Sequence, residues 1–131
     1  MTLPYHPHPG EVLICDFDDS APGAEMVKRR PAVVVSRRDS HGRLLATVVP
    51  LSTTAPIVAM AWHPCLPHLR IVGWPSDVVT WAKCDMLATV SFNRLCKPYV
   101  KTRHGRSYTT HMLSSQDMAA IRAGIRAYLS L

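Results

Sequence analysis

The residues best suited to chemistry lie in a short stretch near the start of the chain. Glu25 and the cations Lys28, Arg29 and Arg30 precede Pro31, which opens an unbroken run of apolar β-forming residues. The run is too short for a helix and lacks polar alternation, so it predicts a strand buried on both faces. Pro31 has no N–H and favours an extended Arg30, so we expect it to be the first residue of the strand. Arg30 then stands at the mouth of the strand, where its planar guanidinium can bind phosphate. A solvated basic turn explains the same residues equally well.

A second pair of residues suited to proton transfer comes later. Residues 77–84 alternate as a strand does, and Lys83 and Asp85 are two positions apart, so an extended backbone would direct both to one side. Asp85 could then act as a general base and Lys83 as a general acid. An ordinary ion pair on one face of a strand is the commoner explanation of this spacing.

Hydroxyl groups supply a third candidate. A strand predicted over residues 44–49 and closed by Pro50 delivers Ser52 and Thr53 at its end. Their hydroxyls make them candidates for contact with a ligand, although capping a turn is the commoner use of such residues. Nucleophile-elbow and glycine-rich phosphate-loop motifs are absent from the sequence, which disfavours Ser–His–Asp hydrolysis and nucleotide binding.

The strongest metal candidate is the cluster His63, Cys65 and His68, which offers three ligands within six residues. Zinc sites usually have four ligands, or three and a water, and paired ligand spacing. The cluster lacks that spacing and contains two prolines. We therefore predict neither a metal site nor another cofactor.

Length and charge restrict the kind of protein and its partners. A chain of 131 residues with 47% hydrophobic residues predicts a single globular domain over residues 1–131, with residues 1–9 as a flexible arm. The net charge of +6 comes entirely from the second half, where nine Lys and Arg stand against three Asp and Glu. One-sided positive charge favours a polyanionic partner, either nucleic acid or an acidic protein.

The same composition indicates the compartment. The start of the chain lacks the pattern of a secretory signal, and no stretch approaches the ~20 apolar residues of a membrane span. We expect a cytoplasmic protein with no membrane partner. The four cysteines should then be free thiols, mostly buried.

The secondary structure needed to position these residues is mainly β. Four strands, a short helix capped by Ser91 and a helix capped by Ser114 are expected, with strands at residues 11–17, 31–36, 44–49 and 77–84. Residues 37–42 favour a hairpin turn, and residues 57–62 and 69–72 could be short edge strands. We predict an α+β fold: a small, strongly bent β-barrel-like sheet with a short helix and a C-terminal helix packed on it.

A basic hairpin is expected between residues 99 and 110, around His104 and Gly105. It mixes cations with aromatic residues, as binders of single-stranded nucleic acid do: Tyr99, Lys101, Arg103, His104, Arg106 and Tyr108. A solvated hairpin explains this composition equally well.

The order of these features resembles the MazF/PemK family of type II toxin–antitoxin toxins, over roughly residues 9–129. The resemblance rests on Asp16-Phe17-Asp18, Gly23-x-Glu25, Arg30-Pro31, Val49-Pro50-Leu51-Ser52-Thr53, Lys83-Cys84-Asp85, Thr89 and Asn93-Arg94-Leu95. It implies an SH3-like barrel of the CcdB/PemK type and a homodimer. It also implies metal-independent cleavage of single-stranded RNA through the 2′-hydroxyl, leaving a 2′,3′-cyclic phosphate. The implied protein partner is a cognate acidic antitoxin whose tail covers the active groove.

The resemblance also implies roles for particular residues. Carried over by position, the catalytic residues are Arg30, Asp85, Ser52, Lys83 and Glu25, and the substrate-binding residues are Thr53, Arg29, Lys28, Lys101 and Arg103. Ser52 replaces the usual threonine, and Lys83 stands where some members have a catalytic arginine. Ala24, Met86 and Ala88 replace a loop histidine, a glutamine and an arginine found in members of the family. These departures concern the affinity for RNA and the RNA sequence that is recognised.

Two classes of function remain open at this point. The first is a toxin endoribonuclease. The second is a binding module of the same fold that lacks catalysis or poisons a protein target, as a gyrase-directed toxin family of this architecture does. An RNase requires Arg30, Ser52 or Thr53, and Asp85 to act on one groove, whereas a pure binding module does not.

Overall fold

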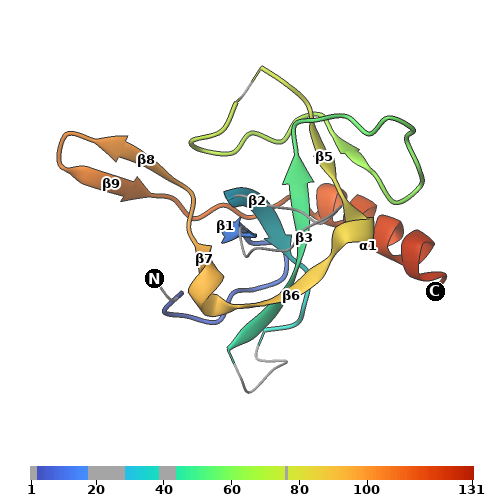
Figure 1. The fold of residues 1–131 in the computed structure, drawn as a ribbon, viewed down its shortest axis with the longest axis horizontal. Helices are drawn as coiled ribbons and strands as arrows, with labels where there is room; N and C mark the ends of the chain where they lie inside the picture. Colours follow the sequence, from blue (N-terminus) through green and yellow to red (C-terminus); the bar gives the residue numbers. More distant parts are fainter. Residues whose placement is uncertain (1–2, 18–28, 39–43, 76) are drawn as a thin grey trace.

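The valine run after Pro31 forms the middle of an antiparallel sheet. The computed structural model describes residues 3–17, 29–38, 44–75 and 77–131. Its strands are β1 (Val12–Asp16), β2 (Arg29–Val34), β3 (Leu45–Ser52), β4 (Cys65–Leu66), β5 (Thr80–Ala82), β6 (Ala88–Ser91), β7 (Leu95–Cys96), β8 (Tyr99–Thr102) and β9 (Gly105–Tyr108). Two 3₁₀ turns, η1 (Cys84–Met86) and η2 (Phe92–Arg94), and the helix α1 (Ser115–Leu129) complete the described elements (Figure 1).

The pairing order confirms the mainly β prediction. Among the described residues, seven strands form one sheet in the order β4-β5-β3-β2-β1-β7, with β6 also paired to β3, and β8 and β9 form a separate hairpin. Residues 32–34 of β2 are fully buried, as a strand covered on both faces must be. The order runs from β4 at one edge to β7 at the other.

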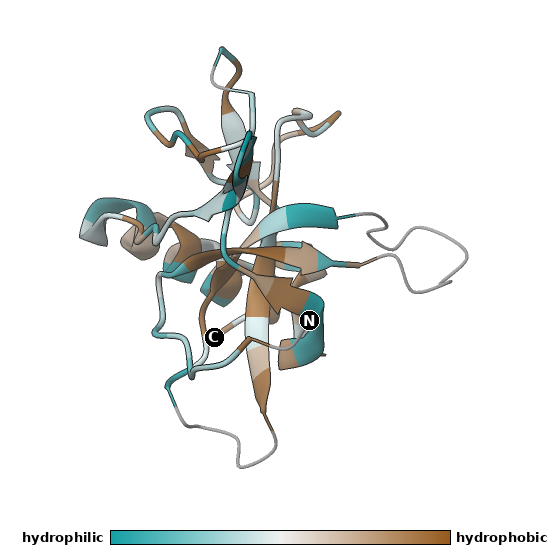
Figure 2. Cartoon of the chain, turned by 90° about the vertical axis from the view of Figure 1, so that its left-hand side faces the viewer, coloured by the Kyte–Doolittle hydropathy of each residue, from teal (hydrophilic) through white to brown (hydrophobic). Residues whose placement is uncertain are grey.

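Both faces of the sheet carry an apolar core. One face packs against α1 through Met118 and Ile121 and against Leu66, Leu69 and Ile71 of the long connection after β3. The other face is covered by Leu3, Phe92 and Leu95. Figure 2 shows the apolar strands grouped in the middle of the molecule. The hairpin β8–β9 extends from the body on one side, and α1 lies on the other (Figure 1).

The edge of β3 is shared by two strands that follow one another. β5 pairs with Leu51 and Ser52, and β6 pairs with residues 45–48. From Ala82 to Ala88 the chain advances six residues while β3 covers only three, from Leu51 to Val48. The three extra residues must leave the ladder, and they form η1. The expectation that Lys83 and Asp85 share one face of an extended segment is therefore wrong.

The C-terminal helix forms where the sequence predicts it. Ser114 caps α1, because its Oγ accepts a hydrogen bond from the N–H of Asp117 at 3.1 Å. Met118 and Ile121 are buried, but Tyr128 and Leu129 near the end of the helix are more than 40% exposed. The last turn thus extends past the sheet that the helix covers.

Other local predictions have mixed outcomes. Ser91 caps η2 by accepting from Asn93 N, and the hairpin around His104 and Gly105 is confirmed. Residues 57–62 and 69–72 are not strands; in that region only β4 is paired. Pro50 does not close its strand, since β3 continues to Ser52. The predicted turn at residues 37–42 lies mostly outside the described residues.

Pro50 is tolerated inside β3 for a geometric reason. Its carbonyl accepts a hydrogen bond from the N–H of Lys83 at 2.9 Å, so this residue's backbone polar groups face β5. The N–H that proline lacks would point the same way, and its absence removes no bond to β2.

The described part of the expected arm, residues 3–9, is docked on the sheet. Leu3 is 4% exposed and donates its N–H to the carbonyl of Phe92 at 2.9 Å. The hydroxyl of Tyr5 donates to the carboxylate of Glu11, which is buried at 3% exposure. A buried leucine and a satisfied buried carboxylate hold this segment in place, which differs from the flexible arm we expected. Within the described residues, no helix is long and apolar enough to cross a membrane.

Gly124 allows α1 to approach η1 closely, which gives a stability test. A Cβ on Gly124 would lie 2.8 Å from Cys84 Sγ and 3.2 Å from Pro64 Cδ. Gly124→Ala should therefore lower the free energy of unfolding by about 1 kcal/mol or more, although alanine favours a helix. Urea unfolding measures this change. In a Cys84→Ala background, which removes the closest atom, the same substitution should be neutral or stabilising. An equal loss in both backgrounds would contradict the close approach as its cause.

Candidate active site

A pocket opens where β2 and β3 part. The N–H groups of Val34 and Val35 bond to Glu11 and Thr47, so alternate residues of β2 face β1 and β3. By this alternation Pro31 faces β3, and it has no N–H to donate. The β2–β3 ladder accordingly ends at the pair Ala32–Pro50, while the β1–β2 ladder continues to Arg29. Pro31 thus lies just outside the pairing with β3 and is the third residue of β2, not the first as we expected.

The pocket collects three of the predicted site residues. It is lined by Arg30, Pro31, Leu51, Ser52, Thr53, Ile71, Trp74, Pro75 and Thr80. Arg30 comes from the end of β2, and Ser52 and Thr53 from the end of β3. A guanidinium beside two hydroxyl groups can bind the oxygens of a phosphate.

The two hydroxyl residues differ in their surroundings. Ser52 is buried at 7% exposure, and its Oγ accepts a hydrogen bond from the N–H of Thr54 at 3.1 Å. Ser52 therefore caps a turn, which was the alternative reading of the sequence, and its own O–H is still able to donate. Thr53 is exposed at the rim.

Lys83 and Asp85 do not line this pocket. Lys83 follows β5 directly, and Trp81 of β5 lies opposite Ser52. Alternation places Lys83 on the face of Ser52, roughly 7 Å along the strand. Asp85 lies in η1, outside the ladder. The structure thus brings Arg30, Ser52 and Thr53 together and leaves Asp85 apart from them.

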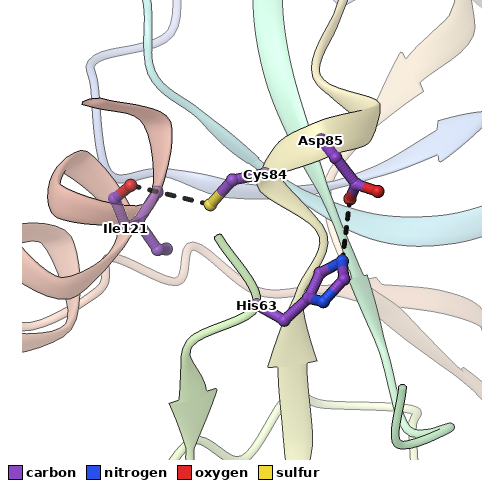
Figure 3. Close-up of polar contacts among 4 residues, drawn as sticks. All are labelled: His63, Cys84, Asp85 and Ile121. Atoms are coloured by element: carbon purple, nitrogen blue, oxygen red, sulfur yellow. Dashed lines mark hydrogen bonds and ion pairs between the residues drawn. The ribbon is translucent and has the colours of Figure 1, made fainter. Parts of the chain in front are cut away.

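Asp85 instead pairs with His63. His63 Nε2 lies 3.1 Å from Asp85 Oδ1 (Figure 3). Backbone hydrogen bonds from Ala82 N to the carbonyl of Pro64 and from Cys84 N to the carbonyl of Trp62 hold the two segments together. The carboxylate side chain remains 31% exposed, so it can also reach solvent or a ligand. A histidine held by a carboxylate is an arrangement used in general acid–base catalysis. The two residues are 22 positions apart, so no local pattern in the sequence predicted this pair.

The cluster His63, Cys65 and His68 does not converge on a metal ion. His63 contacts Asp85, while Cys65 and His68 are exposed. Across the part of the chain that the structure describes, no three His, Cys, Asp or Glu side chains form a group suited to a metal.

The cysteines are free thiols, as expected, but only two of them are buried. These are Cys15 and Cys84. Burial raises the pKa of each to about 12. Both thiols therefore stay protonated at neutral pH and are poor nucleophiles.

The remaining predicted residues fall into two groups. Arg29 points away from the pocket, and its Nη2 donates to Cys96 Sγ at 3.3 Å. Lys101 and Arg103 are exposed on the β8–β9 hairpin, apart from the residues that line the pocket. Glu25 and Lys28 lie outside the described residues.

The family of the chain follows from its sequence. Residues 8–129 match the family model of PemK-like, MazF-like toxins of type II toxin–antitoxin systems. The chain belongs to this toxin family. The resemblance drawn from the order of motifs is thereby confirmed. A search of curated proteins gave no match.

Solved structures share the fold of this MazF-like chain. MazF from Deinococcus radiodurans has a TM-score of 0.68 and 21% identity, covering 97% of this chain and 99% of that one. The Mycobacterium tuberculosis toxin MazF-mt6 has a TM-score of 0.62 and 17% identity, covering 92% and 97%. A mycobacterial endoribonuclease in complex with its cognate antitoxin has a TM-score of 0.58 and 17% identity, covering 95% and 96%.

The two hydroxyl residues should respond differently to substitution. Ser52→Ala removes the acceptor for Thr54 N and should lower the free energy of unfolding by about 1 kcal/mol. Thr53→Ala removes an exposed hydroxyl and should change it by less than about 0.5 kcal/mol. Urea unfolding of both variants measures this contrast. Equal destabilisation would show that Ser52 does not cap the turn. An activity change in Thr53→Ala can then be assigned to function.

Proposed function

We propose that this MazF-like toxin is an endoribonuclease that cleaves single-stranded RNA and is neutralised by a cognate acidic antitoxin. The observation that carries the proposal is the pocket shared by Arg30, Ser52 and Thr53 at the parted ends of β2 and β3. Membership of the toxin family supports it. Further support comes from the similar mycobacterial protein, which is an endoribonuclease with a cognate antitoxin.

Arg30 is assigned to the scissile phosphate. Its guanidinium offers two parallel N–H donors to the phosphate oxygens, and Ser52 and Thr53 offer hydroxyls from the other wall of the pocket. Charge accumulates on these oxygens as the phosphorus becomes five-coordinate. Donors already fixed by strand backbone stabilise that charge without reorganisation.

Proton transfer is assigned to the neighbouring residues. In the proposed step the 2′-oxygen of the RNA attacks phosphorus, and the bond from phosphorus to the 5′-oxygen breaks. Asp85, aligned by His63, accepts the 2′-hydroxyl proton, and Lys83 donates a proton to the departing 5′-oxygen. The products are a 2′,3′-cyclic phosphate and a free 5′-hydroxyl, and the step uses no metal ion. Because Asp85 does not line the pocket, substrate binding must bring the 2′-hydroxyl to it.

The other predicted residues are assigned to binding. Glu25 and Lys28 belong to the loop before Arg30, and we assign Glu25 a part in catalysis and Lys28 a contact with RNA. Arg29, Lys101 and Arg103 are assigned to the phosphates of flanking nucleotides. The proposal includes an SH3-like barrel, a homodimer and action in the cytoplasm, as the family resemblance implies. Sedimentation as a monomer at micromolar concentration would contradict the dimer.

An RNA-cleavage assay in excess chelator tests the function. The purified protein should cleave single-stranded RNA and leave 2′,3′-cyclic phosphate ends. Arg30→Ala should slow cleavage on the order of 10²-fold or more, because it removes a preorganised donor to a developing anion. Arg30→Lys should restore activity only in part, since lysine keeps the charge but loses the planar fork.

Arg122→Ala is the matched control, because Arg122 is an exposed arginine on α1. It should cleave at the wild-type rate. Cleavage that requires added zinc or magnesium would refute the metal-independent step. Growth arrest without RNA cleavage would instead support the alternative, a binding module that poisons a protein target.

A further inference from the structure

The pocket lined by Arg30, Ser52 and Thr53, which we call the catalytic pocket, shares a lining residue with a second hollow, and that hollow shares one with a third. The second, which we call the aromatic pocket, has a volume of about 250 Å³ and is lined by Ile14, Arg29, Gly73, Trp74 and Tyr99. Trp74 also lines the catalytic pocket. The two hollows therefore share one lining residue.

The third hollow, the arginine pocket, is smaller, at about 120 Å³. It is lined by Asp16, Arg29, Asn93, Arg94, Leu95, Cys96 and Arg106. Three arginines, from β2, η2 and β9, thus line this hollow together with one acidic residue, Asp16. Arg29 also lines the aromatic pocket, so Trp74 is a lining residue of the first two hollows and Arg29 of the last two.

Backbone contacts hold the aromatic pocket in shape. Gly73 has a φ of +84°, and a Cβ there would lie 2.6 Å from the carbonyl oxygen of Tyr99. Only glycine allows this approach, which holds the Trp74 loop against the start of β8. Trp74 and Tyr99 both line the hollow beside this close approach.

The hairpin also positions the arginine pocket. The Arg106 guanidinium lies 4.4 Å from the centroid of the Tyr99 ring, and the rings of Tyr99 and Tyr108 are 5.6 Å apart. Arg29, which lines the same pocket, donates to Cys96 Sγ at 3.3 Å. Stacking and hydrogen bonding restrict these guanidiniums before any ligand arrives.

We propose that the three hollows are one track for consecutive nucleotides of single-stranded RNA. The scissile phosphate occupies the catalytic pocket, the adjoining base enters the larger aromatic pocket between Trp74 and Tyr99, and a flanking phosphate occupies the arginine pocket. The inference deepens the proposed endoribonuclease function and rests on it. It assigns roles to Trp74, Arg94 and Arg106, and it makes β8–β9 one wall of the substrate site.

The alternation of chemistry along the track favours RNA over an acidic peptide. Base–aromatic stacking followed by a cluster of cations matches the repeat of base and phosphate in a single strand. The arginine pocket keeps an excess of two positive charges after Asp16 is counted, which suits a phosphate. An acidic peptide would also bind the cations, but it has no base to stack in the aromatic pocket between them and Arg30.

A scan of neutral phosphates tests the track. The probe is a short RNA with a 2′-deoxy nucleotide at the cleavage site, so that it binds without reacting. One phosphate at a time is replaced by a methylphosphonate, and Kd is measured by fluorescence anisotropy. For the wild type, neutralising one flanking phosphate should raise Kd about tenfold, the loss of a charge-assisted contact.

The Arg106→Ala variant identifies that phosphate. Arg106 is fully exposed on the hairpin, so its removal should leave the fold intact. This variant should bind the unmodified RNA more weakly than the wild type does. Neutralising the flanking phosphate should then change its Kd by no more than about twofold, whereas neutralising the scissile phosphate should still raise its Kd. Arg122→Ala should keep the wild-type pattern. An abasic nucleotide at the adjoining position should raise the Kd of the wild type and of Trp74→Phe. It should leave the Kd of Trp74→Ala unchanged.

Several results would overturn the track. One is an Arg106→Ala variant whose Kd responds to each neutral phosphate as the wild type's does, or one that binds every modified RNA more weakly by the same factor. Another is a loss of binding to the acidic antitoxin with RNA binding unchanged, which would make the arginine pocket a protein-docking surface. A wild type that neither binds nor cleaves RNA would refute the proposed function itself, whereas normal cleavage without a flanking-phosphate effect would refute only the track.

Discussion

The end of the β2–β3 ladder is the constraint on which the site depends. Pro31 faces β3 without an N–H, so the two strands can pair only as far as Ala32 and Pro50. Beyond that pair the strands part, and the side chains of Arg30 and Ser52 line the hollow between them. β1 still pairs with Arg29 and Arg30, so these cations sit on ordered backbone although they lie past the end of one ladder. Alternation then sends the two arginines to different hollows.

A second interruption, at the other edge of β3, determines where the acidic group lies. The three residues that cannot fit between β5 and β6 form η1 and carry Asp85 out of the sheet. α1 packs against this turn through the bare Cα of Gly124, and His63 approaches Asp85 from the strand-like segment before β4. The pair His63–Asp85 is therefore positioned by packing between helix and turn, independently of the pocket that holds Arg30.

Folding brings part of the surplus positive charge together around one hollow. Arg94 and Arg106 come from the basic second half of the sequence, and they meet Arg29 from the first half around one hollow. Lys101 and Arg103 lie further out on the same hairpin, where solvent screens their charges more strongly. Net charge alone indicates a polyanionic partner. The lining residues Trp74 and Arg29, each common to two hollows, also indicate the order in which a ligand would occupy the hollows.

Local sequence determined much of the framework. The buried strand after Pro31, the caps at Ser91 and Ser114 and the hairpin at His104-Gly105 follow from residue types within a few positions, because capping, turn formation and apolar patterning act over that range. The order of motifs likewise identified the toxin family. Tertiary structure alone decided the separation of Asp85 from Arg30, the pairing of His63 with Asp85 and the approach of Gly73 to Tyr99. Each depends on strand register or on contact between distant segments, and register is set by the hydrogen bonding of the whole sheet rather than by the residues of one strand.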